Sequence, residues 1–409
     1  MSLTDQEFRA KLENHFSLYR INLRSPLASR IAPNRWYRVD ILLVNELGLF
    51  RRSDIEPNGQ VTVTCNLLTP SEESMTPLVE QDSDWEIDIA PAPNFQEGQL
   101  AREPNSVPGF HRSGKGTFLY RVRAKHNQAI RGKRFLCIQP TKILQFATTI
   151  QPLTVGPVEI IPDLKQDDRD TPLPLELWNN QPQDMVYDGY RVFSNGQVAI
   201  HEMWDTGIPG KIWDSALVML EVIKRVVEHH PEYVDGKHTL DLSAGTGLIG
   251  LYVASMMSSP KSNIGRGKIT ITELDEAVQL IDRNILINGH LKKFSDLSTK
   301  SLLWGNKAEA EKCTKADLII ASDVLYEAHF FEDLVKTFVD LSKETTRIYI
   351  GYKRRGFNKE EEQMFWSLCK SHGFQVTLLQ FDGKQDTDDI LVPPMTLETG
   401  VQLYRLLPI

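Results

Sequence analysis

Apolar residues recur at every second position in short segments of the first 161 residues. Successive side chains of a strand point to opposite faces, so alternating segments bounded by turn-forming residues such as EPNGQ and TPSEES are typical of strands. We therefore predict an all-β, sandwich-like domain over residues 1–161. The segments that carry the pattern are YRVDILLV (37–44), VTVTC (61–65), WEIDI (85–89), GTFLYRVRA (116–124) and KRFLCIQP (133–140).

The pattern differs in the second half of the chain. MVYDGYRVFSNGQVAIHEM (185–203) has two strand-like runs around Asn195-Gly196, a pair that suits the positive φ angles of a tight hairpin turn. Apolar residues then recur at helical spacing over 212–230. From there, strand-like segments (238–242, 268–274, 316–323, 347–352) alternate with helical ones (248–257, 276–288, 331–342, 359–372).

This alternation predicts a C-terminal α/β domain with a Rossmann-like parallel sheet covered by helices. Two closing strand-like runs, 374–381 and 401–409, are joined by a polar loop, so we expect the last strand to be antiparallel. The acidic, proline-interrupted stretch PDLKQDDRDTPLPLE (162–176) has the composition of a solvated linker. We therefore place the C-terminal domain at residues 177–409.

Composition limits the function classes. The chain has 409 residues, a net charge of −8 and 41 % hydrophobic residues, which is typical of a globular protein and argues against a dedicated nucleic-acid binder. No apolar run approaches the roughly 20 residues of a membrane-spanning helix, and the N-terminus lacks the apolar block of a signal peptide. The four cysteines lie far apart, so we expect reduced thiols, no metal site, and a cytoplasmic protein with the nucleus as a second location.

Candidate chemistry lies where the early strands of the α/β domain end, because open α/β sheets bind ligands at that edge. Asp241-Leu-Ser-Ala-Gly-Thr-Gly247 forms a glycine-rich turn between a strand and a helix, and such turns let a ligand approach the backbone. Glu273 ends the next strand, where a carboxylate can accept hydrogen bonds from both ribose hydroxyls of a nucleoside. No GxxxxGK[ST] sequence is present, which argues against a P-loop NTPase, whereas the glycines alone leave a dehydrogenase open.

These segments in order resemble the class I, seven-β-strand S-adenosylmethionine-dependent methyltransferases, and more narrowly the family-16 protein-lysine methyltransferases. The resemblance implies a seven-stranded sheet, S-adenosyl-L-methionine as methyl donor and a lysine side chain of a protein as acceptor. It covers a little over half of the chain and rests on GKIWDSALVMLEVI, LDLSAGTGLIGLYVA, ITELDEAVQLIDRNILIN, LLWGN and ADLIIASDVLYEAHFFEDLVKTF.

The resemblance also implies which residues bind the donor. Trp304 would lie beside the adenine, Glu273 would hold the ribose, and the glycine-rich turn would lie beneath the methionine moiety. Ser243 stands where the usual pattern has its first glycine, and we expect there either a negative φ or a slightly altered turn. The implied donor-binding residues are Trp213, Asp241, Ser243, Gly245, Gly247, Glu273, Trp304 and Ser322.

Asp323 and Tyr326 match the family's Asp-x-x-Tyr motif, which implies that they act in catalysis. Asp323 would orient the lysine amine or accept its proton through water, and Tyr326 would line the channel. An amide or base-amine methyltransferase would carry (Asn/Asp)-Pro-Pro-Tyr in place of Asp-Val-Leu-Tyr. A small-molecule or RNA acceptor, and a catalytically idle binding protein that keeps the fold, are the alternatives.

The N-terminal domain carries no catalytic motif but has a basic segment, RVRAKHNQAIRGKR (121–134). This segment is either a contact surface for an acidic partner or an RNA backbone, or the solvent face of two strands. We expect the domain to recruit the protein substrate or, alternatively, to stabilise its neighbour. Translation factors and chaperones are candidate substrates because related enzymes use them.

Overall fold

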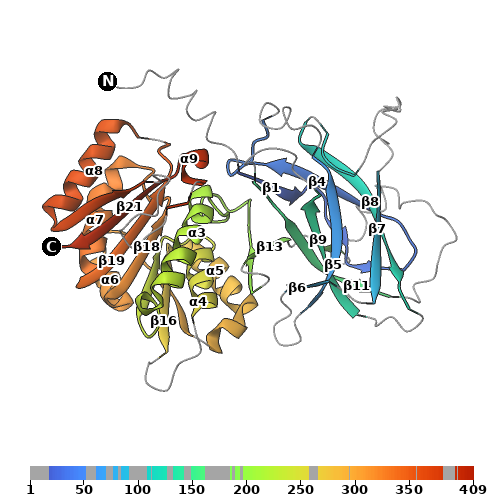
Figure 1. The fold of residues 1–409 in the computed structure, drawn as a ribbon, viewed down its shortest axis with the longest axis horizontal. Helices are drawn as coiled ribbons and strands as arrows, with labels where there is room; N and C mark the ends of the chain where they lie inside the picture. Colours follow the sequence, from blue (N-terminus) through green and yellow to red (C-terminus); the bar gives the residue numbers. More distant parts are fainter. Residues whose placement is uncertain are drawn as a thin grey trace. The chain divides into compact units, whose positions relative to one another are not determined.

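The computed structural model divides the chain into two compact units, Phe16–Ala199 and a second that contains Ile200–Ile409. Each unit is described by itself, and Figure 1 labels its elements. The structure describes residues 18–51, 61–70, 77–81, 84–91, 108–111, 113–126, 132–141, 149–161, 185–186, 189–193, 197–257, 266–293, 295–355, 357–380, 392–393 and 395–409.

The N-terminal unit contains two sheets that share one core. One sheet has the strand order β10-β1-β4-β8-β7, and the other has the order β14-β13-β11-β9-β5-β6 with β3 beside β11. The strands are β1 (Leu18–Leu23), β2 (Leu27–Ala28), β3 (Arg30–Ile31), β4 (Tyr37–Val44), β5 (Val63–Pro70), β6 (Pro77–Gln81), β7 (Trp85–Pro91), β8 (Lys115–Ala124), β9 (Gly132–Pro140), β10 (Thr149–Gln151), β11 (Leu153–Ile160), β12 (Met185–Val186), β13 (Gly189–Phe193) and β14 (Val198–His201).

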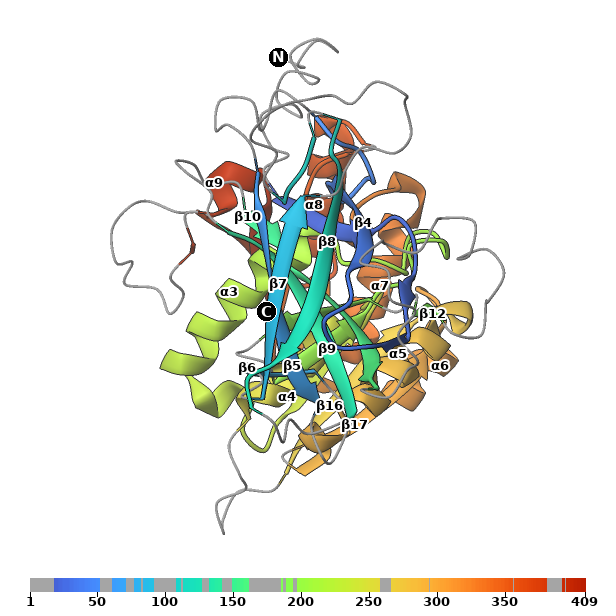
Figure 2. The same ribbon diagram turned by 90° about the vertical axis from the view of Figure 1, so that its right-hand side faces the viewer.

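The alternation read from the sequence corresponds to these strands. Val39 and Phe118 of the first sheet and Val63 and Val155 of the second belong to one buried cluster. Strands β7 and β8 pair antiparallel from Trp85–Ala124 to Pro91–Phe118 and lie side by side in Figure 2. The predicted sandwich-like, mainly antiparallel architecture is therefore present.

The division between the units falls later in the chain than the sequence pattern indicates. We assigned the hairpin of 185–203 to the C-terminal domain, but β12 pairs with β2 and β13 pairs with β11. These backbone hydrogen bonds attach both strands to the N-terminal unit, which ends at Ala199. Strands β13 and β14 are neighbours as a hairpin requires, and Asn195-Gly196 lies outside the described residues.

The C-terminal unit is built on a seven-stranded sheet with the order β17-β16-β15-β18-β19-β21-β20. Strands β15 to β19 pair parallel, whereas β21 runs antiparallel to both β19 and β20, as predicted for the last strand. The strands are β15 (His238–Leu242), β16 (Gly267–Glu273), β17 (Ser295–Ser301), β18 (Ala316–Ser322), β19 (Ser342–Tyr352), β20 (Phe374–Leu379) and β21 (Gln402–Pro408).

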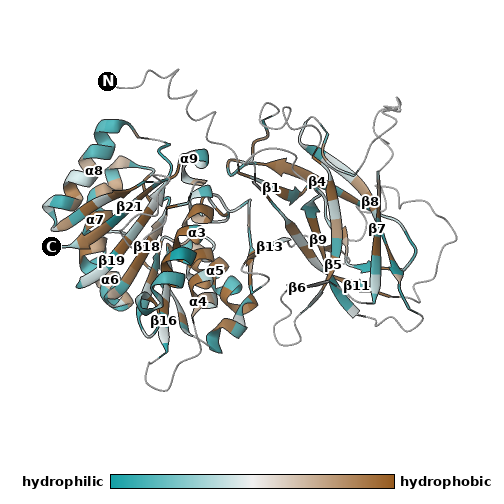
Figure 3. Cartoon of the chain, viewed as in Figure 1, coloured by the Kyte–Doolittle hydropathy of each residue, from teal (hydrophilic) through white to brown (hydrophobic). Residues whose placement is uncertain are grey.

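Helices cover both faces of this sheet. Apolar residues of α6, α7 and α8 form one buried cluster with the sheet, in which Phe338 and Phe365 pack with Ile319 and Ile348, while α3, α4 and α5 lie on the other face (Figure 1). The central strands are coloured hydrophobic along most of their length in Figure 3. The helices are α3 (Asp214–His229), η5 (Pro231–Tyr233), α4 (Leu248–Met256), α5 (Asp275–Ile287), η6 (Gly289–Lys293), α6 (Lys307–Cys313), η7 (Ala328–Phe330), α7 (Phe331–Leu341), α8 (Lys359–Ser371) and α9 (Met395–Thr399).

The hydrophobic pattern missed one strand of the sheet. Strand β17 has the sequence SDLSTKS, which contains a single large apolar residue, Leu297. It is the edge strand and pairs only with β16 among the described residues, from Ser295–Gly267 to Ser301–Glu273. An edge strand with polar side chains discourages pairing with other chains, and it leaves no alternating signal in the sequence.

Candidate active site

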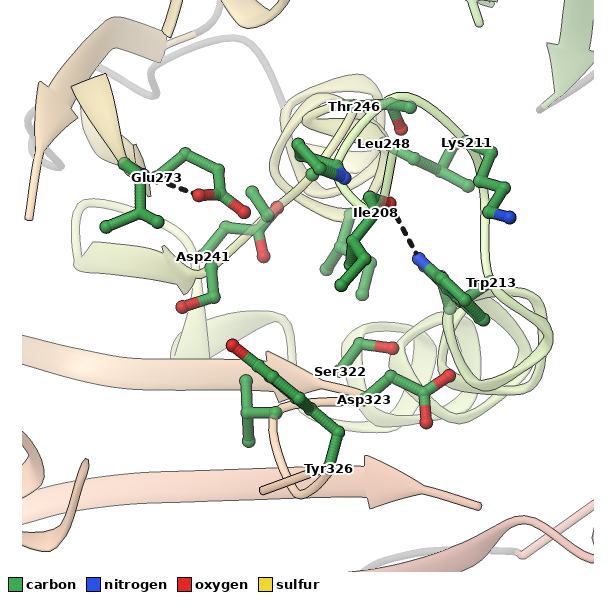
Figure 4. A pocket seen from close by; sticks show the side chains of 18 of the residues that line it. Ile208, Lys211, Trp213, Asp241, Thr246, Leu248, Glu273, Ser322, Asp323 and Tyr326 are labelled. Carbon is green, nitrogen blue, oxygen red and sulfur yellow. Dashed lines mark hydrogen bonds between the residues drawn. The ribbon is translucent and has the colours of Figure 1, made fainter. Parts of the chain in front are cut away.

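A cavity of about 610 Å³ opens at the carboxyl ends of the early strands of the C-terminal sheet. Figure 4 shows Asp241 and Glu273 on one side of it, Trp213 on the opposite side, and Asp323 with Tyr326 along a third. Of the ten residues singled out from the sequence, the cavity is lined by Trp213, Asp241, Ser243, Gly245, Glu273, Trp304, Ser322, Asp323 and Tyr326. Gly247 is the exception.

The glycine-rich turn follows β15 with an unusual backbone. Ser243, Gly245 and Gly247 all have positive φ, at 55°, 56° and 79°. Of the two alternatives expected at Ser243, a negative φ or a slightly altered turn, the negative φ is wrong, because the serine adopts the left-handed conformation that a glycine would adopt. Gly247 is the N-cap of α4, and a Cβ there would lie 3.2 Å from Ile281 Cγ2, so this glycine serves helix packing.

Asp241 is a buried carboxylate at the start of this turn. It is 1 % exposed, and its Oδ2 accepts a hydrogen bond of 2.7 Å from the Gly250 backbone N–H. Oδ1 has no hydrogen-bond partner within the described part of the chain. Burial disfavours the charged form and raises the pKa of Asp241 to about 7. This side chain can thus accept one further hydrogen bond from a ligand, or it can pair with a cationic group.

Glu273 is the last residue of β16 and reaches the same cavity. Its Oε2 accepts a hydrogen bond of 2.5 Å from the Leu274 backbone N–H. Burial raises the pKa of Glu273, and the hydrogen bonds from the backbone of Leu274 and Gly245 act in the opposite direction. A carboxylate at this strand end has oxygen available for polar hydrogens of a ligand, as the sequence pattern predicts.

Trp304 follows the edge strand β17 and reaches across to the glycine-rich turn. Its Nε1 donates a hydrogen bond of 2.9 Å to Ser243 Oγ. Its ring lies 6.0 Å from that of Tyr326 and 6.1 Å from that of Phe330, between centroids. The indole thus contacts the glycine-rich turn and the segment after β18 that contains Tyr326 and Phe330. Together these rings form an aromatic wall of the cavity.

Trp213 lies at the N-cap of α3 and forms the opposite wall. Its Nε1 donates to the Ile208 carbonyl at 3.0 Å. Lys211 Nζ and the Arg355 guanidinium lie 4.8 and 4.9 Å from the centre of its ring system. Cations at such distances from an aromatic face are attracted to it, so the indole is held by contacts on several sides.

Asp323 follows β18 with a left-handed backbone, φ 55°. Its N–H donates to the Gly351 carbonyl at 2.7 Å. Its Oδ1 accepts from the Lys353 backbone N–H at 3.1 Å and from Arg355 Nη1 at 2.5 Å. Oδ2 has no partner among the described residues, although the side chain is only 6 % exposed. One oxygen is thus anchored, and the other is available to a ligand.

Ser322 and Tyr326 flank Asp323 in the chain and line the cavity beside it. The Ser322 hydroxyl is buried and has no hydrogen-bond partner in the described ranges. Burial raises the pKa of Tyr326, and the nearby charges of Glu273 and Glu327 act in the same direction. The phenol therefore stays neutral and acts as a wall and a hydrogen-bond donor.

Sequence reasoning missed several residues of the site. Arg355 comes from the loop after β19, and Lys211 and Ile208 come from the segment before α3. The basic run Lys353-Arg354-Arg355 directly after a strand is the only sequence signal that could have indicated Arg355. Ile208 belongs to no motif, and Lys211 lies in the segment GKIWDSALVMLEVI, which does not indicate by itself that the lysine lines the cavity.

The described residues include no group of three or more histidine, cysteine or acidic side chains placed to hold a metal ion. Within the same residues, no helix has both the length and the apolar character needed to cross a membrane.

Comparison with known proteins places the cavity in a family context. Residues 192–372 match a family model described as lysine methyltransferase. The chain is 26 % identical to the protein N-lysine methyltransferase METTL21A of Xenopus tropicalis, over 47 % of this chain and 82 % of that protein. It is 31 % identical to the protein-lysine methyltransferase METTL21E of Bos taurus, over 44 % and 57 %.

The similar proteins also include a relative from yeast and a solved structure. The protein-lysine N-methyltransferase EFM6 of Saccharomyces cerevisiae is 28 % identical over 41 % of this chain and 71 % of its own length. The crystal structure of a precorrin-6y C5,15-methyltransferase from Geobacter metallireducens is 12 % identical and covers 45 % of this chain and 86 % of that one, with a TM-score of 0.30. The matched family region includes all ten residues singled out from the sequence.

Proposed function

We propose that this chain, whose residues 192–372 match a family model described as lysine methyltransferase, transfers a methyl group from S-adenosylmethionine to a lysine side chain of a protein. The observation that carries the proposal is that one cavity brings together three carboxylates, those of Asp241, Glu273 and Asp323, at the carboxyl edge of the sheet. The relatives that share this region are named as protein-lysine methyltransferases.

The residues of the cavity suit the donor. The donor carries a positively charged sulfonium, an amino group and two ribose hydroxyls, and it supplies an electrophilic methyl group. Asp241 Oδ1 and the Ser322 hydroxyl are buried polar atoms without a hydrogen-bond partner among the described residues, so each can bind a polar group of the donor. Glu273 can accept from the ribose hydroxyls, and the flat ring of Trp304 can pack against adenine. Gly245 lines the cavity, and an added Cβ there would lie 3.3 Å from the Pro209 carbonyl oxygen, so a larger residue would crowd the turn.

Methyl transfer to lysine needs a neutral amine in line with the methyl–sulfur bond. A lysine amine has a pKa near 10.4 in water, and an apolar, aromatic environment lowers it by disfavouring the charge. Trp213, Trp304 and Tyr326 provide such walls. As the nitrogen–carbon bond forms, the carbon–sulfur bond breaks, and a proton leaves the nitrogen. We assign to Asp323 Oδ2 the role of orienting the amine and accepting that proton, directly or through water.

The acceptor could belong to another class. The Asp-Val-Leu-Tyr sequence at 323–326 lacks the two prolines expected of an amide or base-amine methyltransferase, which supports lysine. A small molecule, an RNA or no acceptor at all are the competing readings. Translation factors and chaperones are the protein classes that we put forward, and we propose a cytoplasmic location with the nucleus as a second one.

We propose that the N-terminal unit recruits the protein substrate. The structure revises the part that the basic segment 121–134 could take in this. Arg121 and Arg123 both form ion pairs with Asp88 across the strand pair, at 2.9 and 2.6 Å, and Arg134 is buried. Residues 127–131 of that segment lie outside the described residues. An acidic partner that binds Arg121 or Arg123 would therefore have to displace the carboxylate of Asp88.

The test is a methyl-labelling reaction with the full chain, tritiated S-adenosylmethionine and a cell lysate, counted separately in protein, RNA and small-molecule fractions. We expect label in protein, with methylated lysine after hydrolysis. Label confined to RNA or to small molecules would contradict the lysine proposal. Donor binding measured by calorimetry, combined with no label in any fraction, would support the idle binding protein.

A further inference from the structure

Ser243 occupies a backbone conformation that serine normally avoids. Its φ of 55° lies in the left-handed region, where a Cβ crowds the following carbonyl, and glycine is the residue that adopts it without cost. The neighbouring Gly245 has almost the same φ, 56°. A glycine at position 243 would thus adopt this backbone conformation with less strain than the serine does. We therefore expect the serine side chain to make an interaction that offsets the strain.

Among the residues that the structure describes, the hydroxyl of Ser243 has one hydrogen-bond partner, the indole of Trp304. Nε1 of Trp304 donates to Ser243 Oγ at 2.9 Å, between residues 61 positions apart. The turn that carries Trp304 is fixed by two more bonds, from the Asn306 N–H to the Leu303 carbonyl at 3.0 Å and from the Gly305 N–H to Thr337 Oγ1 at 2.8 Å. These bonds fix the backbone of the turn, but they leave the rotation of the indole open.

The aromatic neighbours of Trp304 do not select one ring orientation. Tyr326 and Phe330 lie at centroid distances of 6.0 and 6.1 Å with interplanar angles of 51° and 82°. One contact is tilted and the other is edge-on, and both are less directional than a hydrogen bond, which requires Nε1 to point at its acceptor. Ser243 Oγ is therefore the group that decides which face of the indole is presented to the cavity.

We propose that Ser243 is a positioning residue. Its hydrogen bond to Trp304 fixes the orientation of the indole ring against which the base of the methyl donor packs, and this interaction offsets the backbone strain at Ser243. This inference rests on the proposed function, because it assigns the donor's adenine to the Trp304 side of the cavity. A wall that is already oriented loses less conformational freedom on binding, so the benefit lies in donor affinity.

The experiment compares the full chain with Ser243→Gly and Ser243→Ala, and measures binding of S-adenosylmethionine and S-adenosylhomocysteine by calorimetry. We expect donor affinity to fall about three- to tenfold in both variants, as for the loss of one neutral hydrogen bond. The KM for the donor should rise by the same factor, while kcat at saturating donor stays within about twofold. Ser243→Gly should melt about 2–4 °C above Ser243→Ala, because only the glycine relieves the strain.

Trp304→Phe separates positioning from direct contact. Phenylalanine has no Nε1, so Ser243→Gly should change donor affinity by less than about twofold in this background. Ser255→Ala is the matched control, because the Ser255 hydroxyl bonds to the Tyr252 carbonyl within α4, and it should leave affinity unchanged. The inference would be overturned if Ser243→Gly left donor affinity unchanged. It would also be overturned if Ser243→Gly weakened donor binding as much in the Trp304→Phe background as in the wild-type chain. Failure of the wild-type chain to bind either ligand would instead overturn the proposed function.

Discussion

The guanidinium of Arg355 binds one oxygen of the Asp323 carboxylate and leaves the other oxygen without a partner among the described residues. Nη1 lies 2.5 Å from Oδ1, and the Lys353 N–H binds that same oxygen at 3.1 Å. Both side chains are largely buried, at 20 % and 6 % exposure. Two donors on one oxygen fix the plane of the carboxylate, so the second oxygen keeps a constant direction at the edge of the cavity.

Replacement of Arg355 tests this arrangement. We expect Arg355→Met to lower the turnover of protein methylation roughly tenfold or more, since a charge-assisted hydrogen bond of about 1.5–3 kcal/mol is lost. Arg355→Lys keeps the charge without the planar fork and should recover part of the rate. Initial rates at saturating donor provide the measurement. Equal rates for wild type and Arg355→Met would show that Asp323 does not need this anchor.

Substitution of Asp323 and Tyr326 separates the two proposed catalytic residues. We expect Asp323→Ala to abolish most of the turnover, because it removes the acceptor oxygen beside the reacting amine. Tyr326→Phe keeps the ring that packs near Trp304 and should lose less activity. Rates on a protein substrate, with donor affinity measured in parallel, distinguish catalysis from binding. Full activity of the Asp323 variant would make the motif structural only.

Glu273 is expected to control donor affinity. Glu273→Ala should weaken donor binding by about 1.5–3 kcal/mol, if the carboxylate accepts charge-assisted hydrogen bonds. Burial raises the pKa of Glu273, so affinity should begin to fall at a higher pH than for an ordinary glutamate as the solution is acidified. Calorimetry at a series of pH values checks both. An Ala variant that binds donor as tightly as wild type while melting normally would remove Glu273 from the site.

Asp241 should make stability depend on pH. Its pKa in the folded chain is about 7, above the ordinary value of 3.8, so protonation favours the folded state. The cost of burying the charge is full above pH 7, at roughly 4 kcal/mol at most, and fades as the pH falls toward 4.

Asp241→Asn removes that charge and keeps an acceptor for the Gly250 N–H. Without donor, we expect it to raise the melting temperature at pH 8 clearly more than at pH 5. Thermal unfolding at both pH values gives the comparison. An equal effect at the two pH values would mean that the pKa of Asp241 is not raised in the folded chain, because the carboxylate would then be ionised in both the folded and the unfolded state at each pH.

Shortening the chain tests the N-terminal unit. A chain that begins at Leu177 keeps β12 and β13 but lacks β2 and β11, the strands with which they pair, so we expect exposed edges and aggregation. A chain that begins at Ile200 avoids this. Under the recruitment proposal, it should bind donor normally but methylate its protein substrate slowly. Methylation at the full rate would contradict recruitment, and failure of the Ile200 chain to fold would favour a stabilising role.

The sequence by itself determined the fold class and much of the site. Period-two and helical patterns are local, so they identify the sandwich strands and the βα units directly. A parallel sheet aligns the carboxyl ends of its strands, and Asp241, Glu273 and Asp323 at or next to three such ends could therefore be assigned to one edge. Nine of the ten residues singled out from the sequence line the cavity, and among them Trp213 and Trp304 were indicated only by the resemblance to the methyltransferase family.

Only the tertiary structure decided the features that depend on distant contacts. The polar segment 295–301 forms strand β17 because its backbone pairs with β16. Strands β12 and β13 belong to the N-terminal unit because they form hydrogen bonds with β2 and β11, respectively. The left-handed φ of Ser243 is compensated by Trp304, and Asp323 is oriented by Arg355. Each of these pairs, whether of strands or of side chains, joins segments separated by tens of residues in the sequence. No local periodicity encodes such pairs, because their geometry is set by the packing of the sheet that brings the loops together.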